Sequence, residues 1–180
     1  MTAVKRRVTL TMLALAAAVL LTGGVALAKA ISCDGGKCEG TKKADTISGS
    51  IGNDRIFGLG GADVITDPVG DDEIHGGNGG DTISGTFGQD KLYGEDDNDK
   101  LHGGSDADQL FGGAGQDELF DDFGKGDFDR VFGGKGGDFV NVADGDGNDT
   151  VDCGDGTDTV FAEPEDELKN CEIVNPIVDE

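Results

Sequence analysis

Basic and aromatic residues are scarce in this chain of 180 residues. It has 14 Lys and Arg against 37 Asp and Glu, a net charge of −23, and it contains one Tyr and no Trp. Nucleic-acid binding and electrostatic attachment to anionic lipid both need clustered Lys and Arg. The composition therefore argues against a nucleic-acid partner and against a charged membrane surface. The length allows one domain.

Catalytic motifs are missing as well. The chain has only two histidines, His75 and His102, and it contains neither H-E-x-x-H nor G-x-S-x-G. We therefore expect no enzyme. The 33 Gly and the excess negative charge are typical of disordered chains, so composition alone leaves order and disorder open.

The N-terminal segment has the order of a secretory signal peptide. Basic residues at 5–7 precede an apolar run over 8–21, and Ala26-Leu27-Ala28 supplies small residues at a cleavage site. We expect residues 1–28 to be removed, which predicts a secreted, extracellular mature chain.

Two alternatives concern the same segment. An uncleaved membrane anchor is disfavoured because the apolar run is shorter than the roughly 20 residues that a span needs. Lipid modification of Cys33 is disfavoured because Lys29 separates it from that run. No later segment is apolar enough to span a membrane, so we expect no span in the mature chain.

The most informative feature is a nine-residue period of aspartate. An apolar Ile, Leu or Val stands two positions after every repeated Asp, and Gly is frequent at the first and fourth positions of the unit when Asp is numbered sixth. Short insertions precede the tenth and twelfth units. The thirteen residues are Asp45, Asp54, Asp63, Asp72, Asp81, Asp90, Asp99, Asp108, Asp117, Asp129, Asp138, Asp149 and Asp158.

The repeat resembles a known family. Residues 76–84 read GGNGGDTIS and residues 112–120 read GGAGQDELF. This pattern resembles the nonapeptide G-G-x-G-x-D-x-U-x of the hemolysin-type calcium-binding, or repeats-in-toxin (RTX), family. The resemblance covers about residues 40–161. Many such repeats are attached to proteases, lipases or toxins, but no catalytic motif accompanies them here.

The physical interpretation of the repeat is an all-β fold. Six residues rich in Gly and Asp form a turn, and three residues form a short strand with one side chain inward. Eighteen residues then make one coil, and stacked coils make a parallel β-roll with two facing sheets and an Ile, Leu and Val core between them. We expect this roll over 40–161, with about 13 strands in 6.5 coils. Residues 29–39 and 162–180 are expected to cap its ends.

The stacked turns predict a calcium centre. Turns eighteen residues apart lie on one edge, and their carboxylate and carbonyl oxygens suit Ca²⁺ better than Zn²⁺, Cu²⁺ or Mg²⁺. At most 11 ions fit between the turns, and the insertions at 121–123 and at Val142-Ala143 are expected to reduce that number. The alternative is that these Asp residues only solvate turns. The predicted ligands are Asp54, Asp63, Asp72, Asp81, Asp90, Asp99, Asp108, Asp117, Asp129, Asp138, Asp149 and Asp158; Asp45 is omitted because Lys42 and Lys43 share its turn.

Four cysteines flank the repeat, and their even number in an exported chain predicts disulfides. Cys153 and Cys171 are eighteen residues apart, or one coil, and Cys33 and Cys38 would close a small loop before the first unit. This pairing is one of three possible. A zinc site is the alternative, but the spacing lacks a C-x-x-C.

Position nine of alternate units carries rings. Phe57, His75, Tyr93, Phe111 and Phe132 are expected to stack outward on one sheet, whereas the other sheet is mixed. Such a stripe either stabilises neighbouring strands or binds a polysaccharide or protein partner.

These observations together predict a secreted calcium-binding repeat protein that folds when it binds Ca²⁺ and has a structural or adhesive role outside the cell. The alternative is a module that binds a polysaccharide or a protein through the aromatic stripe. Ice binding would need a flat ladder of Thr, and the outward Thr residues are scattered. Typical family members carry a C-terminal export signal, whereas this chain has an N-terminal one.

Overall fold

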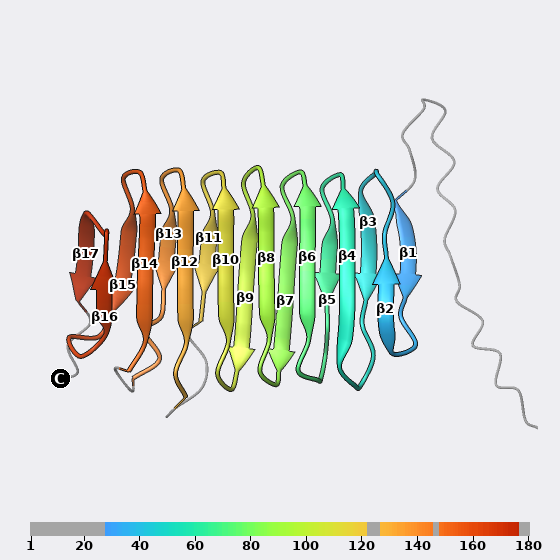
Figure 1. Ribbon diagram of the computed structural model, residues 1–180, viewed down its shortest axis with the longest axis horizontal. Coiled ribbons are helices and arrows are strands. Elements are labelled where there is room, and N and C mark those ends of the chain that lie inside the picture. The colour runs from blue at the N-terminus through green and yellow to red at the C-terminus, as the bar shows by residue number, and fades with distance from the viewer. Residues whose placement is uncertain (1–27, 122–126, 146–147, 177–180) are drawn as a thin grey trace, which may run out of the picture.

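The computed structural model describes residues 28–121, 127–145 and 148–176, and they form a two-layered β-solenoid (Figure 1). Successive strands alternate between a nine-stranded sheet and an eight-stranded sheet, and all neighbouring strands in both sheets are parallel. The all-β parallel roll with two facing sheets is therefore confirmed. None of the described residues forms a helix with the length and apolar character that a membrane span requires.

Odd-numbered strands form one sheet and even-numbered strands form the other. The odd strands are β1 (Lys29–Ser32), β3 (Asp45–Ser48), β5 (Val64–Thr66), β7 (Thr82–Phe87), β9 (Lys100–Ser105), β11 (Glu118–Phe120), β13 (Phe139–Asn141), β15 (Thr159–Ala162) and β17 (Ile173–Pro176). The even strands are β2 (Gly36–Glu39), β4 (Asp54–Gly60), β6 (Glu73–Asn78), β8 (Lys91–Asp96), β10 (Gln109–Ala114), β12 (Arg130–Lys135), β14 (Thr150–Asp155) and β16 (Glu167–Lys169).

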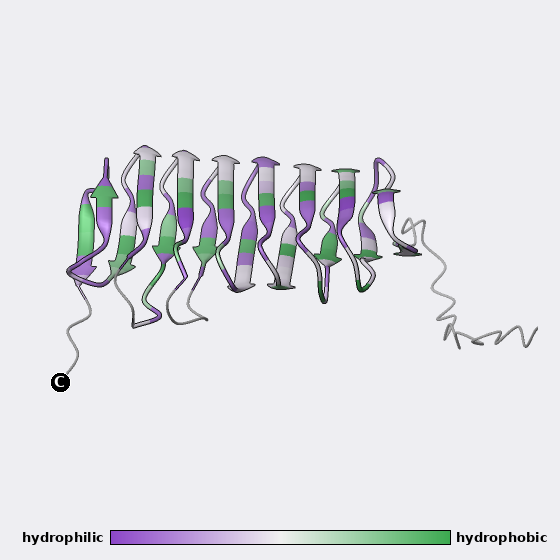
Figure 2. Cartoon of the chain, turned by 60° about the horizontal axis from the view of Figure 1, so that its bottom comes forward, coloured by the Kyte–Doolittle hydropathy of each residue, from purple (hydrophilic) through white to green (hydrophobic). Residues whose placement is uncertain are grey.

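The apolar residue of each unit lies between the sheets. Ile74 pairs with Leu92 in one sheet and Ile83 pairs with Leu101 in the other, each eighteen residues on. These side chains, from Ile47 to Val160, are at most 1% exposed and form one continuous core. In Figure 2 the apolar bands recur from strand to strand along the roll. Apolar residues nine positions apart therefore alternate between the two sheets, and those eighteen apart form one buried column on each sheet.

The strands differ in one respect from the three-residue strands that the sequence predicts. Several contain six residues, and β4 contains seven. In β4 the buried residues include Asp54, Ile56 and Gly58, so Asp, the apolar residue and position one all face inward. Left-handed backbone at positions two and four then reverses the chain. Gly77 and Gly79 have φ of 108° and 111°, and the non-glycine residue Glu95 has φ of 81° at the same place as Gly77.

Both expected caps extend the sheets. β1 and β2 add to the two sheets at one end of the roll, and β17 and β16 add to them at the other. The solenoid thus has 17 strands in the described residues, more than the 13 expected from the repeat.

Two disulfides lie in these end segments and pair as the sequence suggested. Cys33 is bonded to Cys38 and Cys153 to Cys171, with Cα–Cα distances of 5.7 and 5.2 Å. Cys153 is fully buried and Cys38 nearly so, and both belong to the core cluster. The sulfur atoms therefore fill core space near the two ends of the roll.

A ladder of rings covers the outer face of the even sheet. Phe57, His75, Tyr93, Phe111 and Phe132 stack in that order, with centroids 4.5–4.9 Å apart and planes inclined by at most 11°. The odd sheet carries a shorter series, in which His102 and Phe120 are stacked and the contacts of Phe139 with Phe120 and Phe161 are tilted. The spacing of the first ladder equals the usual separation of neighbouring strands.

The core can be tested by comparing two isoleucines. Ile83 is fully buried, so Ile83→Ala should lower the free energy of unfolding in calcium by about 2–5 kcal/mol. Ile51 is 86% exposed, and Ile51→Ala should change it by less than about 0.5 kcal/mol. Urea denaturation followed by circular dichroism measures both. Equal losses in the two variants would contradict the assignment of the core.

Candidate metal centre: two ladders of aspartate

The repeated aspartates form two columns inside the roll. Each Asp comes at the start of a strand, so the seven that precede odd strands line the upper edge in Figure 1 and the six that precede even strands line the lower edge. All thirteen are between 0 and 4% exposed. The structure therefore brings the twelve predicted ligands together in two columns. Their side chains face inward rather than decorating the outside of the turns.

From Asp63 to Asp158, one oxygen of each repeated carboxylate holds the coils in register. The backbone N–H of each Asp donates to Oδ1 of the Asp one coil later, as from Asp81 to Asp99 and from Asp90 to Asp108, both at 2.7 Å. Eleven such bonds of 2.7–3.0 Å run through the two columns. The columns continue across both insertions, because Asp108 bonds to Asp129 and Asp129 to Asp149.

The other oxygen is buried without a hydrogen-bond partner at most positions. The atoms concerned are Oδ1 of Asp54 and Oδ2 of Asp63, Asp72, Asp81, Asp90, Asp99, Asp108, Asp117, Asp138, Asp149 and Asp158. A buried carboxylate oxygen without a partner costs several kcal/mol or binds a proton or a cation. These atoms are the strongest sign of a ligand at the ladders.

The first glycine of the unit gives this oxygen its space. A Cβ on Gly76 would lie 2.3 Å from Oδ2 of Asp81 and 3.0 Å from the carbonyl oxygen of Gly94 in the next coil. A Cβ on Gly94 would meet Asp99 and Gly112 in the same way, at 2.4 and 2.5 Å. The residue at Gly76 and at Gly94 must therefore be small, because the Asp carboxylate and a main-chain carbonyl oxygen of the next coil converge there.

Burial changes the proton affinity of the ladder. Loss of solvent raises the pKa of Asp81, Asp90 and Asp99 to about 7, and neighbouring acids add to the effect. The same causes raise the pKa of Asp108 and Asp149 to about 8. Near neutral pH these carboxyls are therefore divided between the protonated form and a charged form that needs a counter-ion.

Asp45 has a different environment. Burial raises its pKa, but hydrogen bonds from Thr41 and Lys29 outweigh that effect and leave the pKa below its ordinary value. The backbone N–H of Thr41 donates to Oδ2 of Asp45 at 2.6 Å, and the N–H of Lys29 donates to Oδ1. The first Asp of the repeat thus has partners for both oxygens.

The donor set fits a hard cation. The inward groups at the ladders are carboxylate and carbonyl oxygens, which Ca²⁺ prefers and accommodates at variable coordination number. Histidine and thiolate ligands are not involved, since His75 and His102 lie in the outer ring series and all four cysteines are in disulfides. The Asp residues at both edges would hold the ion, which would neutralise their charge.

Four acidic residues in or beside the two aspartate columns were not predicted from the sequence. The N–H of Asp149 donates to Asp166 at 3.1 Å and that of Asp158 donates to Glu172 at 3.0 Å, so these two acids close the columns. The spacings Asp166-x-Leu168 and Glu172-x-Val174 repeat the acid-x-apolar signal and would have found them.

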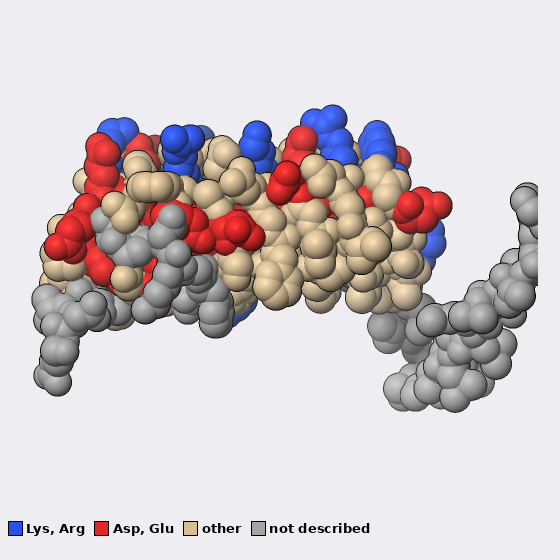
Figure 3. Space-filling model, turned by 90° about the horizontal axis from the view of Figure 1, so that it is seen from below, with Lys and Arg blue, Asp and Glu red and all other residues tan. Residues whose placement is uncertain are grey.

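The other two are Asp67 and Asp121, which stand at position one directly after β5 and β11 and are at most 1% exposed. The nine-residue period gives no sign of them, because it expects glycine there. Figure 3 looks onto the lower edge, where Lys and Arg gather along one margin and the visible acids gather mainly toward the C-terminal half. The ladder residues are largely hidden in this view because they lie inside the roll.

The pKa values predict how pH acts on the metal-free chain. A carboxyl whose pKa is raised by folding contributes stability below its ordinary pKa of about 3.8, and that stability is lost as pH rises through the folded value. For Asp81, Asp90 and Asp108 the loss extends to about pH 7–8. Circular dichroism of protein stripped of metal on a chelating resin should therefore show more β-structure at pH 5 than at pH 8. A metal-free chain that is more structured at pH 8 would contradict the burial of these carboxyls.

Comparison with known proteins agrees with this geometry. The family model of the RTX calcium-binding nonapeptide repeat matches four times, over residues 39–66, 69–92, 84–119 and 141–164. No curated protein and no solved structure gives a significant match. The matches cover more than half of the chain and coincide with the stacked Asp-rich turns. The chain therefore belongs to the family of RTX calcium-binding repeat proteins.

Proposed function

We propose that this protein is a secreted structural or adhesive repeat protein whose folding is driven by Ca²⁺ bound at the aspartate ladders. The observation that carries the proposal is the set of buried carboxylate oxygens without hydrogen-bond partners, repeated coil after coil on both edges. The twelve Asp residues from Asp54 to Asp158 are the proposed ligands. At most about 11 ions would lie between their turns.

Charge couples binding to folding in this proposal. The chain has a net charge of −23, and the roll stacks its acids in two columns inside the molecule. Without a cation the columns of a folded roll would have to bind protons or keep buried carboxylates that repel and are poorly solvated, and both requirements disfavour the metal-free folded state at neutral pH. Calcium offsets that cost only in the folded state, because the unfolded chain has no preformed site. Binding free energy then becomes folding free energy.

The proposed location follows from the family and the N-terminal sequence. RTX repeat proteins are generally secreted, and extracellular calcium is high enough to fill weak sites. The proposed signal peptide, residues 1–28, lies almost wholly outside the described residues. The family is one of structural repeats, and we propose no enzymatic activity for this chain.

A calcium titration tests the proposal. Far-ultraviolet circular dichroism of the metal-free chain at pH 7.5 should change from a largely disordered to a β-rich spectrum as Ca²⁺ is added, and EGTA should reverse the change. Mg²⁺ at the same concentration serves as the control and should have little effect, because it holds its water and needs strict octahedral geometry. A spectrum that neither calcium nor EGTA alters would refute calcium-driven folding.

The ring ladder bears on the alternative, a surface for a polysaccharide or protein partner. Sugars stack on open ring faces, but the faces of His75, Tyr93 and Phe111 are each covered by a ring on both sides at 4.5–4.9 Å. The nitrogens of His75 are also engaged, with Glu95 at 2.8 Å and Glu73 at 3.1 Å. This arrangement favours a stabilising role for the ladder over sugar binding.

Substitution of two phenylalanines distinguishes a stabilising role of the ring ladder from a role in binding a partner. Phe111 stacks on two rings, and each aromatic pair contributes about 0.5–1.5 kcal/mol. Phe111→Ser should therefore lower the free energy of unfolding in calcium by about 1–3 kcal/mol. Phe87 is 55% exposed and outside this stack, so Phe87→Ser should lower it less. A glycan array on which wild type binds and Phe111→Ser does not, with stability unchanged, would support the alternative instead.

A further inference from the structure

The inward column at position one of the odd sheet has two acidic exceptions to glycine, while Val142 and Ala162 at the same position near the C-terminal end are apolar. Gly49 follows β3, and Gly85 and Gly103 lie within β7 and β9, whereas Asp67 follows β5 and Asp121 follows β11. The two exceptions are 54 residues apart, on the lower edge of the roll. Both side chains are buried, at 0 and 1% exposure. Each therefore adds a carboxylate to the interior beside the ladder of Asp residues on that edge.

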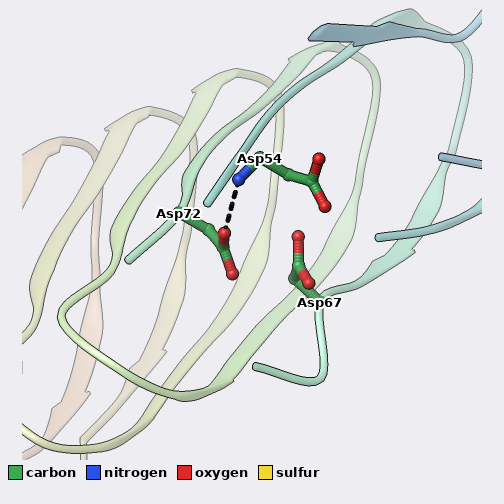
Figure 4. Close-up of side chains that lie close together, drawn as sticks. All are labelled: Asp54, Asp67 and Asp72. Carbon is green, nitrogen blue, oxygen red and sulfur yellow. Dashed lines mark hydrogen bonds between the residues drawn. The ribbon is translucent and has the colours of Figure 1, made fainter. Parts of the chain in front are cut away.

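Asp67 lies in a cluster of three carboxylates. One oxygen each of Asp54, Asp67 and Asp72 lies within 4.8 Å of the other two. Figure 4 shows Asp67 approaching the pair from across the roll, while the N–H of Asp54 donates to Oδ1 of Asp72 at 2.7 Å. Asp54 begins β4, Asp72 ends the turn before β6, and Asp67 comes directly after β5. Three successive strands thus deliver acids to one point.

The polar atoms of this cluster have no partner that explains their burial. Among the described residues, no N–H or hydroxyl donor reaches either oxygen of Asp67, Oδ1 of Asp54 or Oδ2 of Asp72. The polar contact of Asp67 with Asp72 joins two carboxyl groups, so it needs a proton or a cation between them. The charged groups that act on Asp67, namely Asp54, Asp72 and Asp90, are all acidic. Three acids with four such buried oxygens therefore meet in the interior. A cation is the group that would satisfy them together.

The coil before Asp67 is shaped to admit its carboxylate. A Cβ on Gly49 would lie only 2.0 Å from Oδ2 of Asp67, so no larger residue fits at that place. The same holds at the second exception. A Cβ on Gly103 would lie 2.6 Å from Oδ2 of Asp121 and 2.6 Å from Oδ2 of Asp108. Both of these oxygens lack a hydrogen-bond partner. Asp121 therefore meets Asp108 in the interior, and Asp129 in the next coil is a further neighbouring acid.

We propose that these two clusters are internal calcium sites, additional to the sites between the stacked turns. Asp67 with Asp54 and Asp72 would hold one ion, and Asp121 with Asp108 would hold the other, beside Asp129, whose Oδ1 accepts from the N–H of Asp108. This proposal rests on the proposed function, because the internal sites share Asp54, Asp72 and Asp108 with the ladders. It adds ligands that the nonapeptide does not contain. Converging carboxylates are an all-oxygen set that suits Ca²⁺, and burial makes these ions slow to exchange.

Replacement by the glycine of the repeat tests the sites without removing any residue that the roll needs. Asp67→Gly and Asp121→Gly restore the residue found at Gly49 and Gly85, so the variants should fold in calcium. Asp67→Asn keeps the size of the side chain and removes its charge. Asp34→Asn, at an exposed aspartate near the N-terminal end, is the control for loss of one charge.

The measurement counts tightly held ions. Each protein is folded in Ca²⁺, passed through a desalting column in calcium-free buffer, and analysed at once for calcium by inductively coupled plasma mass spectrometry. We expect each single variant at Asp67 or Asp121 to retain one ion fewer than wild type and the double variant two fewer. Asp34→Asn should retain as many as wild type, and all proteins should still fold on addition of calcium.

The outcomes separate this inference from the proposed function. Wild-type folding by calcium together with unchanged ion counts in the variants would overturn the internal sites and leave the ladders as the calcium centre. Two retained ions that the double variant loses, without calcium-driven folding, would uphold the internal sites and overturn the proposed function. No retained ion in wild type, with variants that are more stable in EGTA, would show that protons alone satisfy the clusters.

Discussion

The hydrogen bond from one backbone N–H to the carboxylate of the next coil is the interaction on which this structure depends. It is short, it recurs at every coil, and it fixes the distance along the chain at which two coils meet. Its acceptor must be a short acidic side chain directed inward, and it leaves no room for a Cβ at position one in coils such as those of Gly76 and Gly94. The composition of the repeat therefore follows from one bond and the space around it.

The same carboxylate supplies a structural acceptor with one oxygen and a cation ligand with the other. This division explains why metal and fold are coupled so closely in the proposed function. A protein that kept its ligands on exposed loops could lose the ion and keep its core. Here the core column and the acid column alternate along the same strands, so the Ile, Leu and Val side chains cannot pack unless the acids beside them are also buried.

Much of the fold was predictable because the repeat is regular. The period of nine predicted the alternation of two parallel sheets, the buried column from Ile47 to Val160 and the ring stack from Phe57 to Phe132. The depth of the Asp residues was not predictable, since Asp in a Gly-rich turn is usually solvated. Asp67 and Asp121 were missed because a position-specific pattern treats departures from glycine as noise. Asp166 and Glu172 were missed because their spacing falls outside the nine-residue period.

The ladder bonds also give the roll a direction. Each coil donates its N–H toward the C-terminus and accepts from the coil on its N-terminal side, so a coil is complete only when the one after it is in place. Asp166 and Glu172 accept the last two bonds and so complete the C-terminal end of both columns. If the chain crosses a membrane with its N-terminus first, its N-terminal coils emerge before the C-terminal acceptors Asp166 and Glu172 do. Assembly would then run backward along the chain, from the last segment delivered to the first.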